Sequence, residues 1–246
     1  MRNYGNSFLG SIPAVTRNLL IINLLVWFAQ NTLPRIGIDV EAFLALHYWQ
    51  ASDFNPVQLI SYMFLHGDFS HIFFNMFSLW MFGRILEQVM GQKRFLFYYI
   101  SCGLGAAVIQ ELVWTFTWRA DFIPALANLN QVSITYMSQL VDQALAAGEE
   151  LPFLNQMLTI GASGGVFGIL LAFGMLFPNM PLYLMFIPVP IKAKWMVIGY
   201  GLIELLFGVS GIMNSVAHFA HLGGMLFGFI VLMSWKKKGL FRGGYY

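Results

Sequence analysis

Three polar side chains suited to acyl transfer lie in apolar stretches of this chain. Ser163 belongs to the sequence Gly-Ala-Ser-Gly at 161–164, which opens one apolar stretch, while His71 and His221 lie in two others. A serine hydroxyl becomes a nucleophile when a nearby histidine accepts its proton, and free backbone N–H groups at a helix start can stabilise an oxyanion. Glycine and serine also fill close helix–helix contacts in membranes. The tetrapeptide alone therefore fits either a nucleophile or a packing contact.

The composition predicts a membrane protein. Of the 246 residues, 58% are hydrophobic and only 10% are charged, and the mean hydropathy is +0.68, whereas soluble domains carry about 25% charged residues. The single cysteine, Cys102, lies in an apolar run and excludes a disulfide framework or a cysteine-based metal site. A formal net charge of +2 gives no indication of a nucleic acid partner.

Six apolar segments predict an all-α bundle of six transmembrane helices, which forms one domain over residues 1–246. The segments are 18–30, 59–82, 95–114, 163–177, 195–209 and 215–235. The fourth begins at Ser163 and is short for a bilayer, which requires about 20 residues. No small-residue cleavage pattern follows the first segment, so we expect it to be a retained span.

Loop charges predict the orientation of the chain. With both termini in the cytoplasm, eleven of the 13 Lys and Arg residues lie on the cytoplasmic side, including those of a short basic tail at 236–246. Only Arg35 and Arg119 fall outside, in agreement with the positive-inside rule. We expect a multi-pass protein of the bacterial inner (plasma) membrane.

The longest outer connection, 115–160, contains an amphipathic pattern. Its apolar residues recur at helical spacing with polar residues between them, and they are Ile134, Met137, Leu140, Val141, Ala144 and Leu145. The pattern predicts a helix that lies on the outer surface or against the bundle. A packed loop helix and a role in handling substrate both fit it.

Depth in the membrane brings the polar residues together. Ser163 and His221 each lie 14 residues from the cytoplasmic end of their segments, and His71 lies 13 residues before Arg84. At about 1.5 Å per residue each of these distances is roughly 20 Å. In a hydrocarbon core about 30 Å thick, all three fall in one layer roughly 10 Å below the outer surface. Asn75 follows His71 by four residues and lies on the same helix face, one turn lower. A shared layer of nucleophile, base and donors favours a catalytic site over packing alone.

The order and spacing of four motifs resemble the rhomboid family of intramembrane serine proteases across nearly the whole chain. The motifs are His-Ile-Phe-Phe-Asn at 71–75, Gly-Arg-Ile-Leu-Glu-Gln at 83–88, Gly-Ala-Ser-Gly at 161–164, and Ala-His-Leu-Gly-Gly at 220–224 followed by Gly228. Their combination with the predicted topology makes the resemblance specific.

The resemblance implies a Ser–His dyad, with Ser163 as nucleophile and His221 as general base and acid, and no acidic third member. It also implies that His71, Asn75 and the backbone N–H of Ser163 donate to the oxyanion. Phe167, one turn after Ser163, matches the family position whose aromatic ring packs under the catalytic histidine. No cofactor and no metal are implied.

Glycines near these residues are expected to support close helix contacts. His221, Gly224 and Gly228 follow at i, i+3 and i+7 on one face, so the last segment can approach a neighbour closely. If that neighbour is the segment that starts at Ser163, the imidazole comes within reach of the hydroxyl. Gly161 and Gly164 are expected to serve the same contact.

Two other histidines and one acid leave alternatives open. Only His221 fits the pattern His-x-x-Gly-x-x-x-Gly, so we take it rather than His218 as the base. A zinc site built from His218, His221 and His71 is an alternative, although no carboxylate is expected at that depth. His66 is expected to make a structural hydrogen bond or to anchor at the interface, and Glu204 is either a buried acid or an acid that faces water.

Together these features predict an endopeptidase, surrounded by membrane lipids, that cleaves single-span membrane proteins near the outer side of the bilayer. A helical substrate must unwind before attack because its backbone is fully paired, and the resemblance implies a small residue before the cleavage point. The alternatives are an inactive rhomboid-like protein that binds or extracts membrane proteins, and a transporter or channel lined by the same polar layer. The physiological substrate and the oligomeric state stay open.

Overall fold

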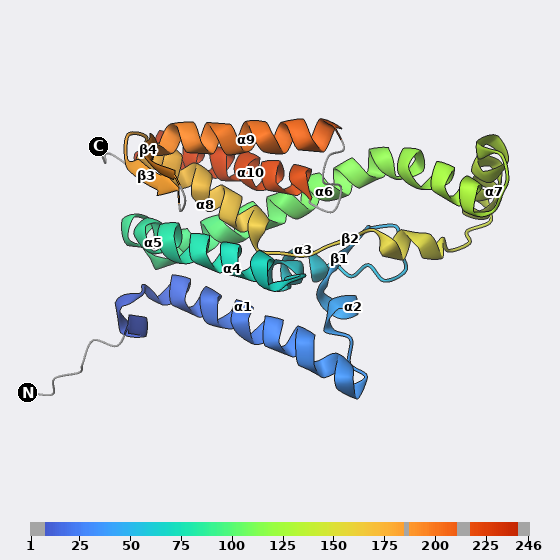
Figure 1. Cartoon of the computed structure of the whole chain (residues 1–246), viewed down its shortest axis with the longest axis horizontal. Helices are drawn as coiled ribbons and strands as arrows, with labels where there is room; N and C mark the ends of the chain where they lie inside the picture. The colour runs from blue at the N-terminus through green and yellow to red at the C-terminus, as the bar shows by residue number, and fades with distance from the viewer. Residues whose placement is uncertain (1–7, 185–186, 211–216, 241–246) are drawn as a thin grey trace, which may run out of the picture.

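The computed structural model describes residues 8–184, 187–210 and 217–240, which form a helical bundle with two small strand pairs (Figure 1). The longer helices are α1 (Ala14–Thr32), α4 (Phe69–Ser78), α5 (Arg84–Met90), α6 (Gln92–Leu129), α7 (Ile134–Ala146), α8 (Ser163–Leu176), α9 (Ala193–Ser210) and α10 (His218–Lys237). The shorter elements are α2 (Val40–Leu44), α3 (Gln58–Ser61), a π-helical turn at Leu79–Gly83 and 3-10 turns at Phe8–Ser11, Leu33–Ile36, Tyr62–Phe64 and Pro152–Gln156. The strands are β1 (Leu46–His47), β2 (Leu158–Thr159), β3 (Pro181–Leu184) and β4 (Ile187–Lys192).

Four of the described helices are long and apolar enough to cross a membrane, namely α1 with the turn that follows it, α6, α9 and α10. α8 is apolar but has only 14 residues. The π-helical turn joins α4 to α5 without interruption, so these elements form one helical stretch. The chain is thus a mainly helical membrane bundle. The predicted start of the last span at residue 215 and most of the predicted basic tail lie outside the described residues.

The second apolar segment begins its helix later than the sequence predicted. A helix from residue 59 was expected, but α3 and a 3-10 turn end at Phe64, and α4 starts at Phe69. Leu65 has an extended backbone, and the Asp68 side chain caps α4 by accepting a hydrogen bond from the His71 N–H at 2.8 Å. A cap of this kind satisfies one of the free N–H groups of the first turn, which explains why the helix restarts here.

α6 is longer than the predicted span 95–114, because it continues to Leu129 through the first part of the 115–160 connection. α7 lies at the far end of α6 (Figure 1), and an ion pair between Arg119 and Asp142 at 2.8 Å joins the two helices. A second apolar cluster outside the main core packs the added turns of α6 against α7 and the first outer connection. Its buried members are Tyr48, Ala51, Trp118, Ile123, Ala127, Met137, Val141, Leu154 and Met157.

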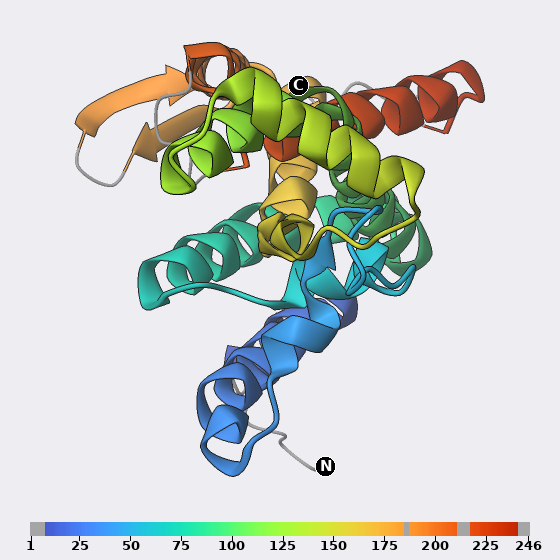
Figure 2. The same cartoon turned by 90° about the vertical axis from the view of Figure 1, so that its right-hand side faces the viewer.

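α8 lies near the middle of the bundle (Figure 2), where small residues let its neighbours approach. A Cβ atom on Gly224 of α10 would overlap the carbonyl oxygen of Gly164 on α8. A Cβ atom on Gly228, one turn further along α10, would overlap the hydroxyl of Tyr98 on α6. That hydroxyl donates a hydrogen bond to the carbonyl oxygen of Gly168 at 2.8 Å. α10 therefore lies so close to α8 at Gly224, and to α6 at Gly228, that only glycine fits at these two positions.

Two strand pairs hold the segments on either side of α8. β1 pairs antiparallel with β2, with Leu46 opposite Thr159, and this pair joins the first outer connection to the segment that leads into α8. Just beyond β2, the Gly161 N–H donates to the carbonyl oxygen of Tyr62 at 2.9 Å. β3 and β4 form a second antiparallel pair between α8 and α9. The start of α8 is therefore held by the β1–β2 pair and by the hydrogen bond from Gly161 to Tyr62.

Replacing Gly224 with Ala is expected to destabilise the bundle, because the added methyl group would meet the backbone carbonyl of Gly164, which cannot rotate away. Overpacking of this kind costs about 1–3 kcal/mol, so the midpoint of thermal unfolding in detergent should fall by several degrees. Gly199→Ala on α9 is the matched control, since a Cβ there meets nothing within 4 Å. Equal midpoints for the two variants would contradict the close contact.

Candidate active site

The turn into α8 places Ser163 at the first position of the helix. Gly161 has φ = +130°, which favours glycine. Ala162 is the N-cap and makes no side-chain hydrogen bond to the first turn. The Val166 N–H donates to the carbonyl oxygen of Ala162 at 3.0 Å. The backbone N–H groups before Val166 thus lie at a helix end that no side chain caps. The helix dipole favours negative charge at this end.

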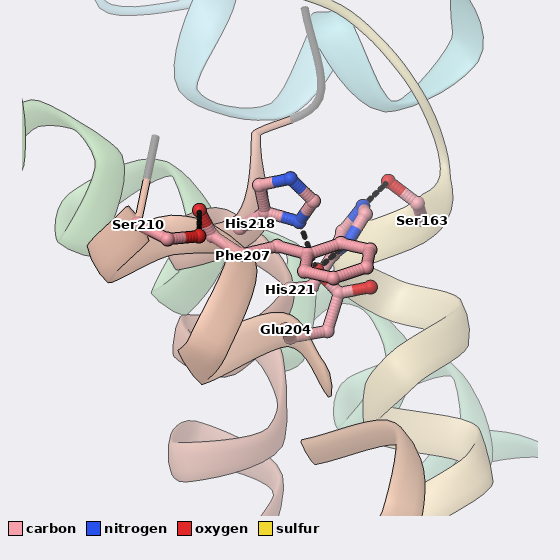
Figure 3. Close-up of polar contacts among 6 residues, drawn as sticks. All are labelled: Ser163, Glu204, Phe207, Ser210, His218 and His221. Atoms are coloured by element: carbon pink, nitrogen blue, oxygen red, sulfur yellow. Dashed lines mark hydrogen bonds and ion pairs between the residues drawn. The ribbon is translucent and has the colours of Figure 1, made fainter. Parts of the chain in front are cut away.

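Ser163 and His221 are joined by a hydrogen bond between α8 and α10. The distance from Ser163 Oγ to His221 Nε2 is 2.8 Å (Figure 3). His221 is 9% exposed, and its ring stacks on that of Phe167 with centroids 4.3 Å apart and planes 6° apart. The contact between Gly164 and Gly224 lies within one turn of both residues. Close helix packing and ring stacking together set the position of the imidazole.

His71 lies beside the same serine. A Cβ atom on Gly161 would be 2.7 Å from His71 Nε2 and 3.6 Å from Ser163 Oγ, so the histidine ring and the serine hydroxyl both border this glycine. Gly161 is needed for its backbone conformation and also because the ring leaves no room for a side chain. The structure thus brings His71 from α4 to the start of α8.

Asn75 is buried on α4 one turn below His71. Its Nδ2 donates a hydrogen bond to the carbonyl oxygen of His71 at 3.0 Å, within its own helix. An amide nitrogen carries two hydrogens, so this bond uses one of them. Asn75 therefore has donor capacity beyond the bond that holds it to α4.

The sequence reasoning named Glu204 on α9 as a possible buried acid but missed its contact with His221. Its Oε2 lies 2.9 Å from His221 Nδ1 and 2.7 Å from His218 Nδ1 (Figure 3). Glu204 and His218 are 9% and 6% exposed. The expectation that no carboxylate lies at the depth of His221 was wrong, and so was the picture of a histidine without an acidic neighbour. One signal was available, since an acid inside an apolar span indicates a functional site.

Among the residues that the structure describes, the same three could hold a metal. One ligand atom from each of Glu204, His218 and His221 lies within 4.8 Å of the others, and two histidines with one glutamate form a known zinc ligand set. His71, which the zinc alternative used, is not in this group of ligand atoms. In the structure both imidazoles bond the carboxylate, so Glu204 Oε2 and the two Nδ1 atoms have partners without an ion.

His66 lies in the connection before α4, and its ring does not make the hydrogen bond that was one of its two expected roles. Its two ring nitrogens are buried and make no hydrogen bond within the described residues, while its backbone N–H donates to Gln30 Oε1 at 3.1 Å. The ring packs edge-on against that of His71, with centroids 5.0 Å apart. Burial, and then the neighbouring His71, lower the pKa of His66 to about 3. A neutral ring packed beside His71 replaces the expected ring hydrogen bond.

Comparison with known proteins identifies the family of the chain. The family model described as "Rhomboid domain" matches residues 53–237, which include α4, α8, α9 and α10. "Rhomboid protein 1, mitochondrial" from Saccharomyces cerevisiae is 27% identical over 217 residues, which are 88% of this chain and 51% of that protein. "Putative rhomboid protease YdcA" from Bacillus subtilis is 28% identical over 90 residues, 35% of this chain and 45% of that protein.

The chain spans about half the length of the curated relatives it matches. The matched region of the family model covers well over half of the 246 residues, and it contains Ser163, His221 and His71 as well as Glu204. The chain belongs to the rhomboid family.

Proposed function

We propose that this chain is an intramembrane serine endopeptidase in which Ser163 is the nucleophile and His221 is the general base and acid. The observation that carries the proposal is the 2.8 Å contact between Ser163 Oγ and His221 Nε2. A neutral imidazole at this distance can accept the hydroxyl proton as the oxygen attacks. The stacked Phe167 ring holds the imidazole in the plane that this transfer needs.

The reaction is an acyl transfer in two halves. In the first, Ser163 Oγ bonds to the carbonyl carbon of the substrate while its proton passes to His221 Nε2. The C–N bond then breaks and the same proton passes to the leaving nitrogen. In the second half, water gives its proton to Nε2, its oxygen attacks the acyl carbon, and the proton returns to Ser163 as the ester bond breaks.

The oxyanion is stabilised at the start of α8. The backbone N–H of Ser163 belongs to the first turn of the helix, which no side chain caps, and His71 borders the same glycine as the serine hydroxyl. The second N–H of the Asn75 amide completes the set of donors. Gly161, Gly164, Gly224 and Gly228 support this geometry by letting the helices and the His71 ring approach.

The proposed substrates are single-span membrane proteins, cleaved near the outer side of the bilayer after a small residue. In this proposal α4–α5 and the short α8 add two spans to the four long helices, so both termini lie on the same side of the membrane. The positive-inside rule supports the cytoplasm as that side. We assign the whole chain, 1–246, to one membrane domain of a bacterial inner membrane, with lipids around it. The 115–160 segment with α7 lies on the outer side, and the basic tail at 236–246 lies inside.

Replacement of Ser163 by Ala is expected to abolish cleavage of a transmembrane substrate and labelling by a fluorophosphonate probe, because the probe bonds to an activated serine oxygen. Both can be measured on purified protein in detergent or lipid. Ser101→Ala, at a half-buried serine of α6, is the control and should leave labelling intact. Cleavage retained by Ser163→Ala would contradict the role of Ser163 as nucleophile. Absence of both cleavage and labelling in the unaltered protein would instead favour an inactive relative that only binds membrane proteins.

Replacement of Asn75 by Ala is expected to lower turnover on the order of 10²–10³-fold, as is typical when one oxyanion donor is lost. Asn23→Ala is a close control, because Asn23 on α1 is also buried and donates to the carbonyl four residues earlier, at 2.8 Å. Both variants lose the same helix bond, but only one loses the proposed donor. Equal turnover in the two variants would reduce Asn75 to a structural role.

A further inference from the structure

Glu204 occupies a position that a Ser–His dyad does not need. We propose that it is a positioning residue that completes a Ser163–His221–Glu204 triad, an inference that rests on the proposed protease function. The three groups lie in line, with Glu204 Oε2 2.9 Å from His221 Nδ1 and His221 Nε2 2.8 Å from Ser163 Oγ (Figure 3). They come from three helices, α9, α10 and α8.

The carboxylate decides which ring nitrogen of His221 carries the hydrogen. An ionised carboxylate can only accept hydrogen bonds, so the hydrogen between Glu204 and His221 must lie on Nδ1. The lone pair of a neutral imidazole is then on Nε2, which faces the serine hydroxyl. Without this partner the ring could carry its hydrogen on Nε2 and could not take the serine proton. Glu204 thus selects the reactive tautomer.

His218 keeps the carboxylate ready for this role. Its Nδ1 donates to the same Oε2 at 2.7 Å, and its ring packs edge-on against Phe207, with centroids 5.7 Å apart. A buried ionised carboxylate is costly unless its oxygens are hydrogen-bonded. A second imidazole donor therefore stabilises the charge and orients the oxygen toward His221. Phe207 and Glu204 both come from α9, so one helix positions the acid and the ring that supports its partner.

The proton balance of the reaction is unchanged by the acid. When Ser163 Oγ bonds to the substrate carbonyl, its proton goes to His221 Nε2, and the ring becomes an imidazolium that keeps its hydrogen on Nδ1. Glu204 stays ionised and stabilises the imidazolium by charge and by the hydrogen bond. The Nε2 proton leaves with the amine when the C–N bond breaks. Glu204 touches neither the substrate nor the transferred proton.

Glu204→Gln tests the triad with little change in shape. The amide can donate to His221 Nδ1 and so favour the unreactive tautomer. We expect kcat to fall on the order of 10²–10⁴-fold, in the range found when a triad acid is made neutral, with KM for a transmembrane substrate within about twofold of the original value. Glu111→Gln is the matched control, since Glu111 is a buried carboxylate on α6 that accepts from the Trp49 N–H at 2.9 Å. It should leave kcat unchanged.

Several outcomes would overturn the triad while the protease function stands. They are a Glu204→Gln protein with full kcat, or one whose kcat loss is matched by Glu111→Gln. Loss of labelling of the unaltered protein after treatment with a chelator would also overturn it, because the cluster would then be a metal site. Failure of the unaltered protein to be labelled at all counts instead against the proposed function.

A second measurement reads the position of the hydrogen in the unaltered protein and uses a variant only to assign the signal. Histidines labelled with ¹⁵N report which ring nitrogen carries hydrogen, and the signal of His221 is identified by its loss in His221→Gln. We expect the directly bonded hydrogen on Nδ1 of a neutral ring. A hydrogen on Nε2 would contradict the proposal, because the carboxylate would then have no donor in His221.

Discussion

The contact between Gly164 on α8 and Gly224 on α10 controls the geometry of the candidate site. Because Gly224 has no Cβ atom, α10 reaches the backbone carbonyl of Gly164, and the side chains of Ser163 and His221 come within 2.8 Å of each other. Hydrogen bonds weaken steeply when the donor and acceptor move apart or lose alignment, so a small increase in helix separation would break this pair. The contact falls in the first turn of α8, where the backbone N–H groups are free for another partner. One packing constraint therefore serves both the base and the oxyanion donors.

Two buried glutamates, Glu87 and Glu204, differ in the groups to which they are hydrogen-bonded. Glu87 accepts hydrogen bonds from the Val15 and Thr16 N–H groups and from the Thr16 hydroxyl, at 2.9, 2.7 and 2.8 Å. These donors belong to the first turn of α1, so Glu87 fastens one helix end to another helix. Glu204 is also buried, but its partners are two imidazoles, one of which bonds a serine. Burying a carboxylate in a membrane protein costs free energy at both positions. The two glutamates are distinguished only by their hydrogen-bond partners.

Helical rise and motif order were enough to predict which helices meet at Ser163, His221 and His71, because depth along a straight span follows from residue count. The same reasoning failed for Glu204, since the rotation of α9 about its axis is set by tertiary contacts such as those of Gly208 with Phe219 and His218. It also failed for the length of α6. Its turns beyond residue 114 are fixed by packing against α7, which a local hydropathy pattern does not encode.

Charge balance gives a physical reason for an acid in a membrane site. In a dyad the attack turns a neutral imidazole into an imidazolium and the carbonyl oxygen of the substrate into an oxyanion, and both new charges lie in surroundings poor in water. With Glu204 present, the imidazolium forms against an existing negative charge at 2.9 Å, so the new positive charge is paired as it appears. The oxyanion forms at the other end, at the start of α8, where the helix dipole and the donors face it. Since isolated charges are most costly in an apolar medium, pairing the imidazolium should matter more here than at a site open to water.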